Sequence, residues 1–268
     1  MPCGTSPNEN KTFSPMKIKV IKIGGKLIEN EEVLASLCDS LSSLGEAFVL
    51  VHGGGVMGSR LAEKLGVEVR MHEGRRITDA ATLEIAVMAY AGLANKRVTA
   101  ALQARGVNAC GLSGCDMGMV VSHRRPAGEI DWGFVGDVDA VNVDALSTLL
   151  DAGATPVISP ITCSRAGELL NTNADSVASA VATGLASKYD VELVFTLDKA
   201  GVLLDVDDDS SLIPTITPAS YAALKAENKI HSGMIPKIDN AYKTIGAGVG
   251  SVRITSPNDL TGGTIVVK

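Results

Sequence analysis

The chain has 268 residues, of which 46% are hydrophobic and 3% aromatic, so it can bury a large core as one α/β domain or as two smaller lobes. Its formal net charge of −6 argues against a nucleic-acid partner, because phosphate backbones require clustered Lys and Arg. Its five cysteines are scattered, with no C-x-x-C pair and no metal-ligand spacing with the four histidines, which predicts a reduced, cytoplasmic protein without a metal site.

The amino-terminal stretch differs in composition from the rest of the chain. Residues 1–15 are rich in Pro, Asn and Ser, and they lack both the basic start and the apolar core of a signal peptide. We therefore expect a flexible amino-terminal arm, followed by a single domain over residues 16–268. No uncharged apolar run approaches the roughly 18 residues that a membrane span needs, so no membrane partner is expected.

A buried strand is predicted over residues 18–23, where β-branched residues dominate. This strand contains Lys22 near its carboxyl end and is followed directly by Gly24 and Gly25. In open α/β sheets ligands bind at this end of the strands, and glycines let backbone N–H groups approach an anion closely. The stretch fits either a phosphate site or an ordinary strand end with a tight turn.

A second strand is predicted over residues 48–51, and it runs into the sequence His52-Gly53-Gly54-Gly55. A helix with a regular apolar face follows. The order of strand, glycine cluster and helix is thus repeated, and right-handed crossovers open both glycine loops at the same edge of the sheet. Two such loops lying side by side are suited to bind one phosphoryl group from two sides.

The second glycine loop also fits a different function. The pattern Gly53-x-Gly55-x-x-Gly58 matches the dinucleotide fingerprint, and Glu73 lies at the distance where a ribose-binding acid belongs. An NAD(P)-dependent dehydrogenase is therefore an alternative. Against it, the fingerprint lies in the second strand-loop-helix unit, and it leaves Lys22 and the first glycine pair without a role.

Residues 74–79 contain a pair of arginines ahead of a predicted helix. Such a pair usually lies in a solvated turn, but Arg76 is alternatively placed to clamp a substrate carboxylate with two hydrogen bonds. Farther along, residues 119–122 and 133–138 flank a charged turn. They predict a hairpin, which is either a flap over a site or, as is more common, an ordinary surface hairpin.

Two later helices begin with residues that suggest chemistry. Residues 171–175 include two Asn, a Thr and an Asp, which is more than one helix cap requires. Lys237 lies in the first turn of a helix that opens at Pro236, where a cation is unfavourable by about 0.3–1 kcal/mol. An anion bound at this helix start would offset the cost, and Asp175 is a candidate counter-charge.

Five motifs follow one another along the chain: Lys22-x-Gly24-Gly25, His52-Gly53-Gly54-Gly55, Gly74-Arg75-Arg76-Ile77-Thr78, Asn171-Thr172-Asn173-Ala174-Asp175 and Gly233-Met234-Ile235-Pro236-Lys237. Together they resemble the N-acetyl-L-glutamate kinases of the amino acid kinase family, in the family's order. The resemblance implies a homodimeric α/β protein, a three-layer αβα sandwich around a mostly parallel sheet. It also implies an acyl-glutamate-binding and dimerisation lobe over residues 16–172 and a nucleotide-binding lobe over residues 173–268.

The activity that the resemblance implies is phosphorylation of the side-chain carboxylate of an N-acyl-L-glutamate by ATP, in arginine biosynthesis, with Mg²⁺ carried by the ATP phosphates. Lys22 and Lys237 would stabilise the transferring phosphoryl group, and Asp175 would hold both lysines in place. Gly25 and Gly54 would donate backbone N–H groups to it. The other implied contacts are Gly53, Gly54, Arg76 and Asn171 to the acyl-glutamate, and Gly24, Gly25, Asp198 and Gly201 to the phosphates and the nucleotide.

Two further questions stay open at the level of the sequence. A non-catalytic, amino-acid-sensing protein of the same fold is a third interpretation beside the kinase and the dehydrogenase. Within the kinase interpretation, acetyl and succinyl substrates differ by one carboxylate, and no residue in the sequence distinguishes them.

We predict a dimer that arginine does not inhibit. Arginine-inhibited members of the resembled family have an extra amino-terminal helix, whereas residues 1–15 lack helical periodicity. Light scattering should give the mass of a dimer, and activity should be unchanged at low arginine concentrations. A hexamer, or inhibition by arginine, would contradict this expectation.

Overall fold

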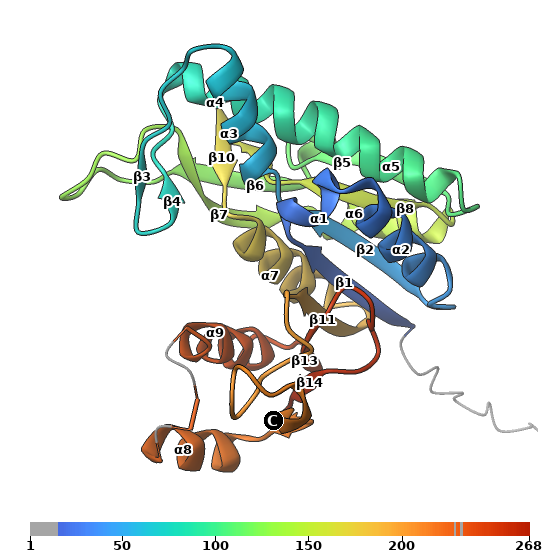
Figure 1. Cartoon of the computed structure of the whole chain (residues 1–268). Coiled ribbons are helices and arrows are strands. Elements are labelled where there is room, and N and C mark those ends of the chain that lie inside the picture. Colours follow the sequence, from blue (N-terminus) through green and yellow to red (C-terminus); the bar gives the residue numbers. More distant parts are fainter. Residues whose placement is uncertain (1–15, 228, 231–232) are drawn as a thin grey trace, which may run out of the picture.

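An eight-stranded sheet forms the centre of the structure, a computed structural model that describes residues 16–227, 229–230 and 233–268 (Figure 1). The expected amino-terminal arm, residues 1–15, lies outside the described residues. In spatial order the strands are β12(Thr215–Ile216), β14(Thr264–Val266), β13(Ser251–Thr255), β11(Asp190–Thr196), β1(Lys17–Ile23), β2(Ala47–His52), β8(Thr155–Ser159) and β5(Ala109–Ser113). Neighbouring strands are parallel except β13 and β14, which pair antiparallel.

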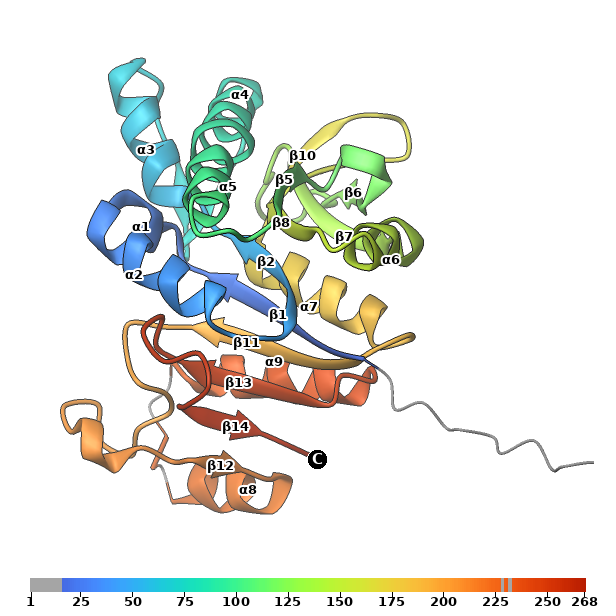
Figure 2. The same cartoon turned by 90° about the vertical axis from the view of Figure 1, so that its right-hand side faces the viewer.

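Helices cover both faces of this sheet (Figure 2). One layer contains α1(Gly25–Glu29), α2(Glu31–Ser42), α3(Gly55–Lys64), α4(Ala80–Ala86), the π-helical segment η1(Val87–Ala94) and α5(Asn95–Gln103). The other contains α6(Val143–Asp151), α7(Ala174–Leu185), α8(Pro218–Ala226) and α9(Ile235–Gly246). The predicted three-layer αβα sandwich with a mostly parallel sheet is confirmed.

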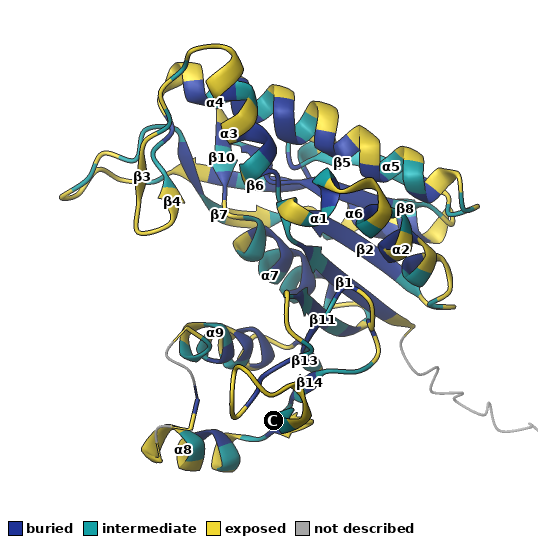
Figure 3. Ribbon diagram, in the orientation of Figure 1, coloured by how far each residue is buried: buried dark blue, intermediate teal, exposed yellow. Residues whose placement is uncertain are grey.

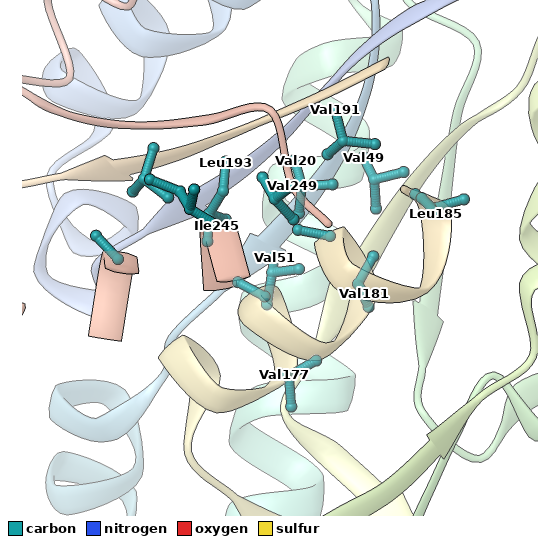
Figure 4. Packing of buried hydrophobic residues seen from close by; sticks show 14 of the residues in the cluster. Val20, Val49, Val51, Val177, Val181, Leu185, Val191, Leu193, Ile245 and Val249 are labelled. Carbon is teal, nitrogen blue, oxygen red and sulfur yellow. The ribbon is translucent and has the colours of Figure 1, made fainter. Parts of the chain in front are cut away.

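Successive side chains of β1 point to opposite faces of the sheet, so this strand packs against both helical layers. Ile18 and Val20 pack with α7 and α9 in one apolar cluster, part of which is drawn in Figure 4, while Ile21 and Ile23 pack with α2 and α5 in another. Side chains two residues apart share a face, so Lys22 projects toward α7, as Val20 does. The central strands are buried, and the helices expose their outer faces (Figure 3).

A small second sheet lies beside the central one. It consists of β10(Leu169–Thr172), β7(Val135–Val141), β6(Val120–Arg124) and β9(Ile161–Cys163) and closes on itself. Strands β6 and β7 pair antiparallel, which confirms the predicted hairpin; residues 120–141 are called the flap below. A short hairpin of β3(Met71–His72) and β4(Arg75–Arg76) contacts this flap, with the rings of His72 and Trp132 stacked edge to face at 5.9 Å.

Among the described residues, no helix is both long enough and apolar enough to cross a membrane.

Candidate active site

The carboxyl ends of β1 and β2 bring the two glycine loops into contact. Ile23 and His52 are paired in register, and the Gly53 N–H donates to the Ile23 carbonyl oxygen at 3.0 Å. A Cβ atom on Gly25 would lie 3.0 Å from the Gly54 nitrogen, and one on Gly53 would lie 3.0 Å from the Gly25 nitrogen. Only glycine lets the two main chains approach this closely. The predicted side-by-side arrangement of the loops is confirmed.

An ion pair joins the first glycine loop to the start of α7. The Lys22 Nζ atom lies 2.8 Å from the Asp175 Oδ1 atom, with 18% of the Lys22 side chain and 41% of the Asp175 side chain exposed. Asn173 caps α7, accepting hydrogen bonds from the backbone N–H groups of Asp175 at 2.9 Å and Ser176 at 3.0 Å. The cap fixes the first turn of α7, so the Asp175 carboxylate stays opposite the end of β1.

A second lysine shares the space beside this ion pair. Lys237, in the first turn of α9, lines a cavity of about 250 Å³ together with Asp175 and Lys243. Among the described residues, Asp175 forms its ion pair with Lys22, and Lys237 lies at the same cavity without an ion pair of its own. The expected grouping of Lys22, Asp175 and Lys237 is therefore present in space, whereas direct pairing of Asp175 with Lys237 stays a prediction.

A second cavity, of about 230 Å³, opens between the second glycine loop, the β3–β4 hairpin, the flap, β10 and the first turn of α7. Ser176 in that turn lines both cavities. All four residues expected to contact the substrate line this second cavity: Gly53, Gly54, Arg76 and Asn171. The Arg76 Nη2 atom donates to the Gly55 carbonyl oxygen at 2.9 Å and to the Ser59 Oγ atom at 2.8 Å. The Asn171 Nδ2 atom donates to the Thr78 Oγ1 atom at 3.0 Å. These bonds hold two polar side chains at the cavity wall.

The cavity wall also contains residues that the sequence did not single out. Arg125 and Trp132 come from the flap, and the Arg125 guanidinium lies 5.5 Å from the centre of the Trp132 ring. Arg125 makes two hydrogen bonds to Asp137, of 3.0 and 2.6 Å, and these lower the pKa of the Asp137 carboxyl. The chain has a single tryptophan, and it follows a stretch rich in charged residues. That unusual position is the feature of the sequence from which this part of the cavity wall could have been predicted.

Three residues expected on the nucleotide side have different surroundings. Asp198 is exposed after the end of β11. Gly201 is buried, and a Cβ there would lie 2.6 Å from the Leu212 Cδ1 atom and 2.7 Å from the Thr264 Oγ1 atom, so packing alone requires this glycine. Gly24 precedes α1, where a Cβ would meet nothing within 4 Å. Their roles toward a nucleotide stay predictions.

His52, at the start of the second glycine loop, is fully buried. Its Nδ1 atom lies 2.8 Å from the Gly53 carbonyl oxygen, and its Nε2 atom lies 3.1 Å from the Asn95 Nδ2 atom. Burial lowers the pKa of His52 from 6.5 to about 4, so the ring is neutral at pH 7. An amide nitrogen only donates, so Nε2 accepts from Asn95 and Nδ1 has the proton.

Comparison with known proteins agrees with this geometry. The model of the amino acid kinase family matches residues 17–256. The chain belongs to this family. The acetylglutamate kinase of Parabacteroides distasonis is 47% identical to this kinase over 91% of the chain and 96% of the relative. The predicted assignment to the acetylglutamate kinases of the family is confirmed.

Solved structures show the same fold. The structure of smu.665 from Streptococcus mutans superposes with a TM-score of 0.74 at 30% identity, covering 93% of this kinase and 98% of that chain. Carbamate kinase from Giardia lamblia bound to AMP-PNP has a TM-score of 0.67 at 17% identity over 94% and 99% of the two chains. The dehydrogenase alternative finds no support, and Glu73, its expected ribose-binding acid, is exposed in the turn between β3 and β4.

The lowered pKa of His52 predicts acid sensitivity of the fold. Between pH 6.5 and about 4, His52 binds a proton in the unfolded chain but not in the folded one. The free energy of unfolding should therefore fall as the pH falls through this window, by up to about 1.4 kcal/mol per pH unit from this residue. Urea unfolding of the wild type and of His52→Phe at several pH values should show a shallower dependence in the variant. Equal slopes would contradict the prediction.

Proposed function

We propose that this kinase transfers the terminal phosphoryl group of ATP to the side-chain carboxylate of N-acetyl-L-glutamate, forming an acyl phosphate in arginine biosynthesis. The observation that supports it best is the Lys22–Asp175 ion pair beside two touching glycine loops, with two cavities that both adjoin the first turn of α7. The relatives at 46–47% identity are named acetylglutamate kinases and match over nearly their whole length.

The acyl-glutamate occupies the cavity lined by the flap. Arg76 binds the substrate's α-carboxylate, because a guanidinium pairs with a carboxylate through two parallel hydrogen bonds. Asn171 binds the acyl-amide group, for which a side-chain amide offers both a donor and an acceptor. Gly53 and Gly54 line the floor, so the side-chain carboxylate of the substrate points toward the glycine loops.

The phosphoryl group in transfer lies against the two glycine loops, at the line where their main chains touch. Lys22 and Lys237 stabilise its negative charge, and the backbone N–H groups of Gly25 and Gly54 donate to its oxygens. Asp175 keeps Lys22 in place through the 2.8 Å ion pair. These groups supply positioning and charge, which is most of what phosphoryl transfer requires of a protein.

The nucleotide occupies the cavity beside α9, within residues 173–268, and the substrate occupies the lobe of residues 16–172. Lys243 lines the nucleotide cavity next to Lys237. The expected contacts of Gly24, Asp198 and Gly201 to the nucleotide and its phosphates belong to this proposal. Mg²⁺ arrives on the ATP phosphates, since it keeps several waters and binds phosphate oxygens readily. We further propose that the protein acts as a cytoplasmic homodimer.

No general base is needed for this reaction. The attacking group is a carboxylate with a reference pKa near 4.3, roughly that of a Glu side chain, so it is ionised at pH 7. His52, the histidine nearest to the glycine loops, is neutral and fully engaged in hydrogen bonds. The site therefore works by binding and electrostatics.

The direct test is release of ADP from Mg-ATP with N-acetyl-L-glutamate, N-succinyl-L-glutamate, glutamate and aspartate in parallel, with hydroxylamine to trap the acyl phosphate. We expect hydroxamate with N-acetyl-L-glutamate and none with the free amino acids. Hydroxamate with none of the four compounds would refute the proposed function. Preference for the succinyl compound would keep the reaction and change the substrate.

Lys237→Ala should lower kcat by about 10²–10³-fold with little change in thermal stability, because one charge-stabilising donor is removed. Asp207→Asn is the matched surface control: Asp207 is exposed in a turn and lines neither cavity, so its substitution should leave kcat unchanged. Activity of Lys237→Ala within a few-fold of the wild type would show that Lys237 is not catalytic.

A further inference from the structure

The orientation of one peptide in the second glycine loop is set by a buried histidine. The neutral His52 ring donates its Nδ1 proton to the Gly53 carbonyl oxygen at 2.8 Å. A trans peptide is planar, so its C=O and N–H bonds point in opposite directions. Because the Gly53 carbonyl points to the ring, the Gly54 N–H points away from it. The first glycine loop lies close to this peptide: a Cβ on Gly25 would be 3.0 Å from the Gly54 nitrogen and 3.3 Å from the Gly53 carbonyl carbon.

The Gly54 N–H is ready to bind a ligand. Gly54 is buried and lines the substrate cavity. Within the described part of the chain, neither a backbone nor a side-chain acceptor takes a hydrogen bond from this N–H, although the adjacent Gly53 N–H is bonded to Ile23. A buried backbone donor is nearly always paired in a native protein, so this one fits an acceptor that the bound substrate supplies.

Asn95 holds the histidine from its other side. The Asn95 Nδ2 atom lies 3.1 Å from the His52 Nε2 atom, 3.1 Å from the Leu112 carbonyl oxygen and 2.9 Å from that of Val157, so its two protons are shared among three acceptors. The Asn95 Oδ1 atom accepts from the Lys96 Nζ atom at 3.1 Å. The two carbonyl oxygens require the amide nitrogen on the side of the ring, and the lysine requires the amide oxygen on the other side. This orientation of the amide also settles which ring nitrogen is protonated.

The π-helical segment explains how Asn95 reaches this position. The Asn95 N–H donates to the Tyr90 carbonyl oxygen, five residues back, as a π-helix requires. Residues five apart in an ordinary α-helix point about 140° away from each other. Here both face the glycine loop: a Cβ on Gly54 would lie 2.3 Å from the Tyr90 Cδ1 atom, while Asn95 bonds His52. A π-helical turn at a functional site is a known pattern.

We propose that His52 and Asn95 are positioning residues that aim the Gly54 N–H at the phosphoryl group in transfer. The inference rests on the proposed function. Neither residue touches the substrate: Asn95 fixes the ring, the ring fixes the Gly53–Gly54 peptide, and the peptide presents its N–H. Tyr90 packs against Gly54 from behind and keeps the loop from turning away.

The test compares His52→Phe with His52→Asn. The first keeps a flat ring without the Nδ1 donor, and the second keeps a side-chain N–H close to the place of Nδ1. Loss of an outer-layer positioning group should lower kcat in His52→Phe by about 10–100-fold, with KM for N-acetyl-L-glutamate within about threefold. His52→Asn should regain most of the lost kcat. His123→Phe is the matched control, since His123 lies exposed in β6 against Asp139.

A second readout does not depend on turnover. In protein labelled with ¹⁵N-glycine, the Gly54 amide resonance should move when AMP-PNP and Mg²⁺ are added to the wild type, and much less in His52→Phe and Asn95→Leu. Thermal unfolding identifies any variant that fails to fold, and His52→Asn and Asn95→Leu then take its place.

The outcomes separate this inference from the proposed function. A wild type that forms no hydroxamate refutes the function, whereas the Gly54 resonance still tests the positioning. A folded His52→Phe with kcat within about threefold of the wild type would overturn the inference. So would a loss of kcat that His52→Asn does not relieve, or a Gly54 resonance that responds equally in wild type and His52→Phe.

Discussion

The ion pair between Lys22 and Asp175 connects the parts of the chain on which the site depends. It joins the carboxyl end of β1 to the first turn of α7, with 2.8 Å between the Lys22 Nζ and Asp175 Oδ1 atoms. The strand holds Lys22 in place, and the helix holds Asp175. Alternation along the buried strand sets the side on which Lys22 emerges, and the Asn173 cap sets the start of α7. Asp175 lines the cavity beside α9, and its neighbours Ala174 and Ser176 line the substrate cavity, so both cavities adjoin the first turn of α7 that contains this pair.

The local charge of the site contrasts with that of the whole protein. The chain has a net charge of −6, yet Lys22, Lys237, Lys243 and Arg76 gather around the two cavities. A cleft lined by one sign of charge focuses the field toward its interior, even within an acidic surface. The ion pairs of Lys22 with Asp175 and of Arg125 with Asp137 partly neutralise this positive charge and hold the two cationic side chains in position.

Much of the fold and part of the site follow from the sequence, because they depend on local rules. Hydrophobic period and glycine position predicted β1, β2 and the contact between their loops, and the misplaced cation predicted Lys237 at a cavity. The substrate-side wall was harder, since Trp132 and Arg125 reach it through pairing of the flap with the rest of the small sheet.

The His52–Asn95 contact lay beyond sequence analysis for a different reason. The sequence predicts an ordinary helix after residues 74–79, and no propensity signals that residues 87–94 wind as a π-helix. The π-helical winding changes which residues share a face of the helix. Tyr90 and Asn95 lie on the same face here, whereas in an α-helix they would point in different directions. Contacts that depend on such a change appear only in three dimensions.

The seam between the glycine loops also limits the ways in which this site can evolve. A methyl group on Gly25 or Gly53 would meet main-chain atoms of the opposite loop. Main-chain atoms are present in every residue, so no substitution in the opposite loop can remove this clash. On the far side of the loop, Gly54 and Gly58 face the Tyr90 ring, a side chain that can be replaced by a smaller one. A larger residue at Gly25 or Gly53 therefore cannot be compensated by a second substitution. A larger residue at Gly54 or Gly58 can be compensated by a smaller residue at position 90, so these positions can change together in homologous enzymes.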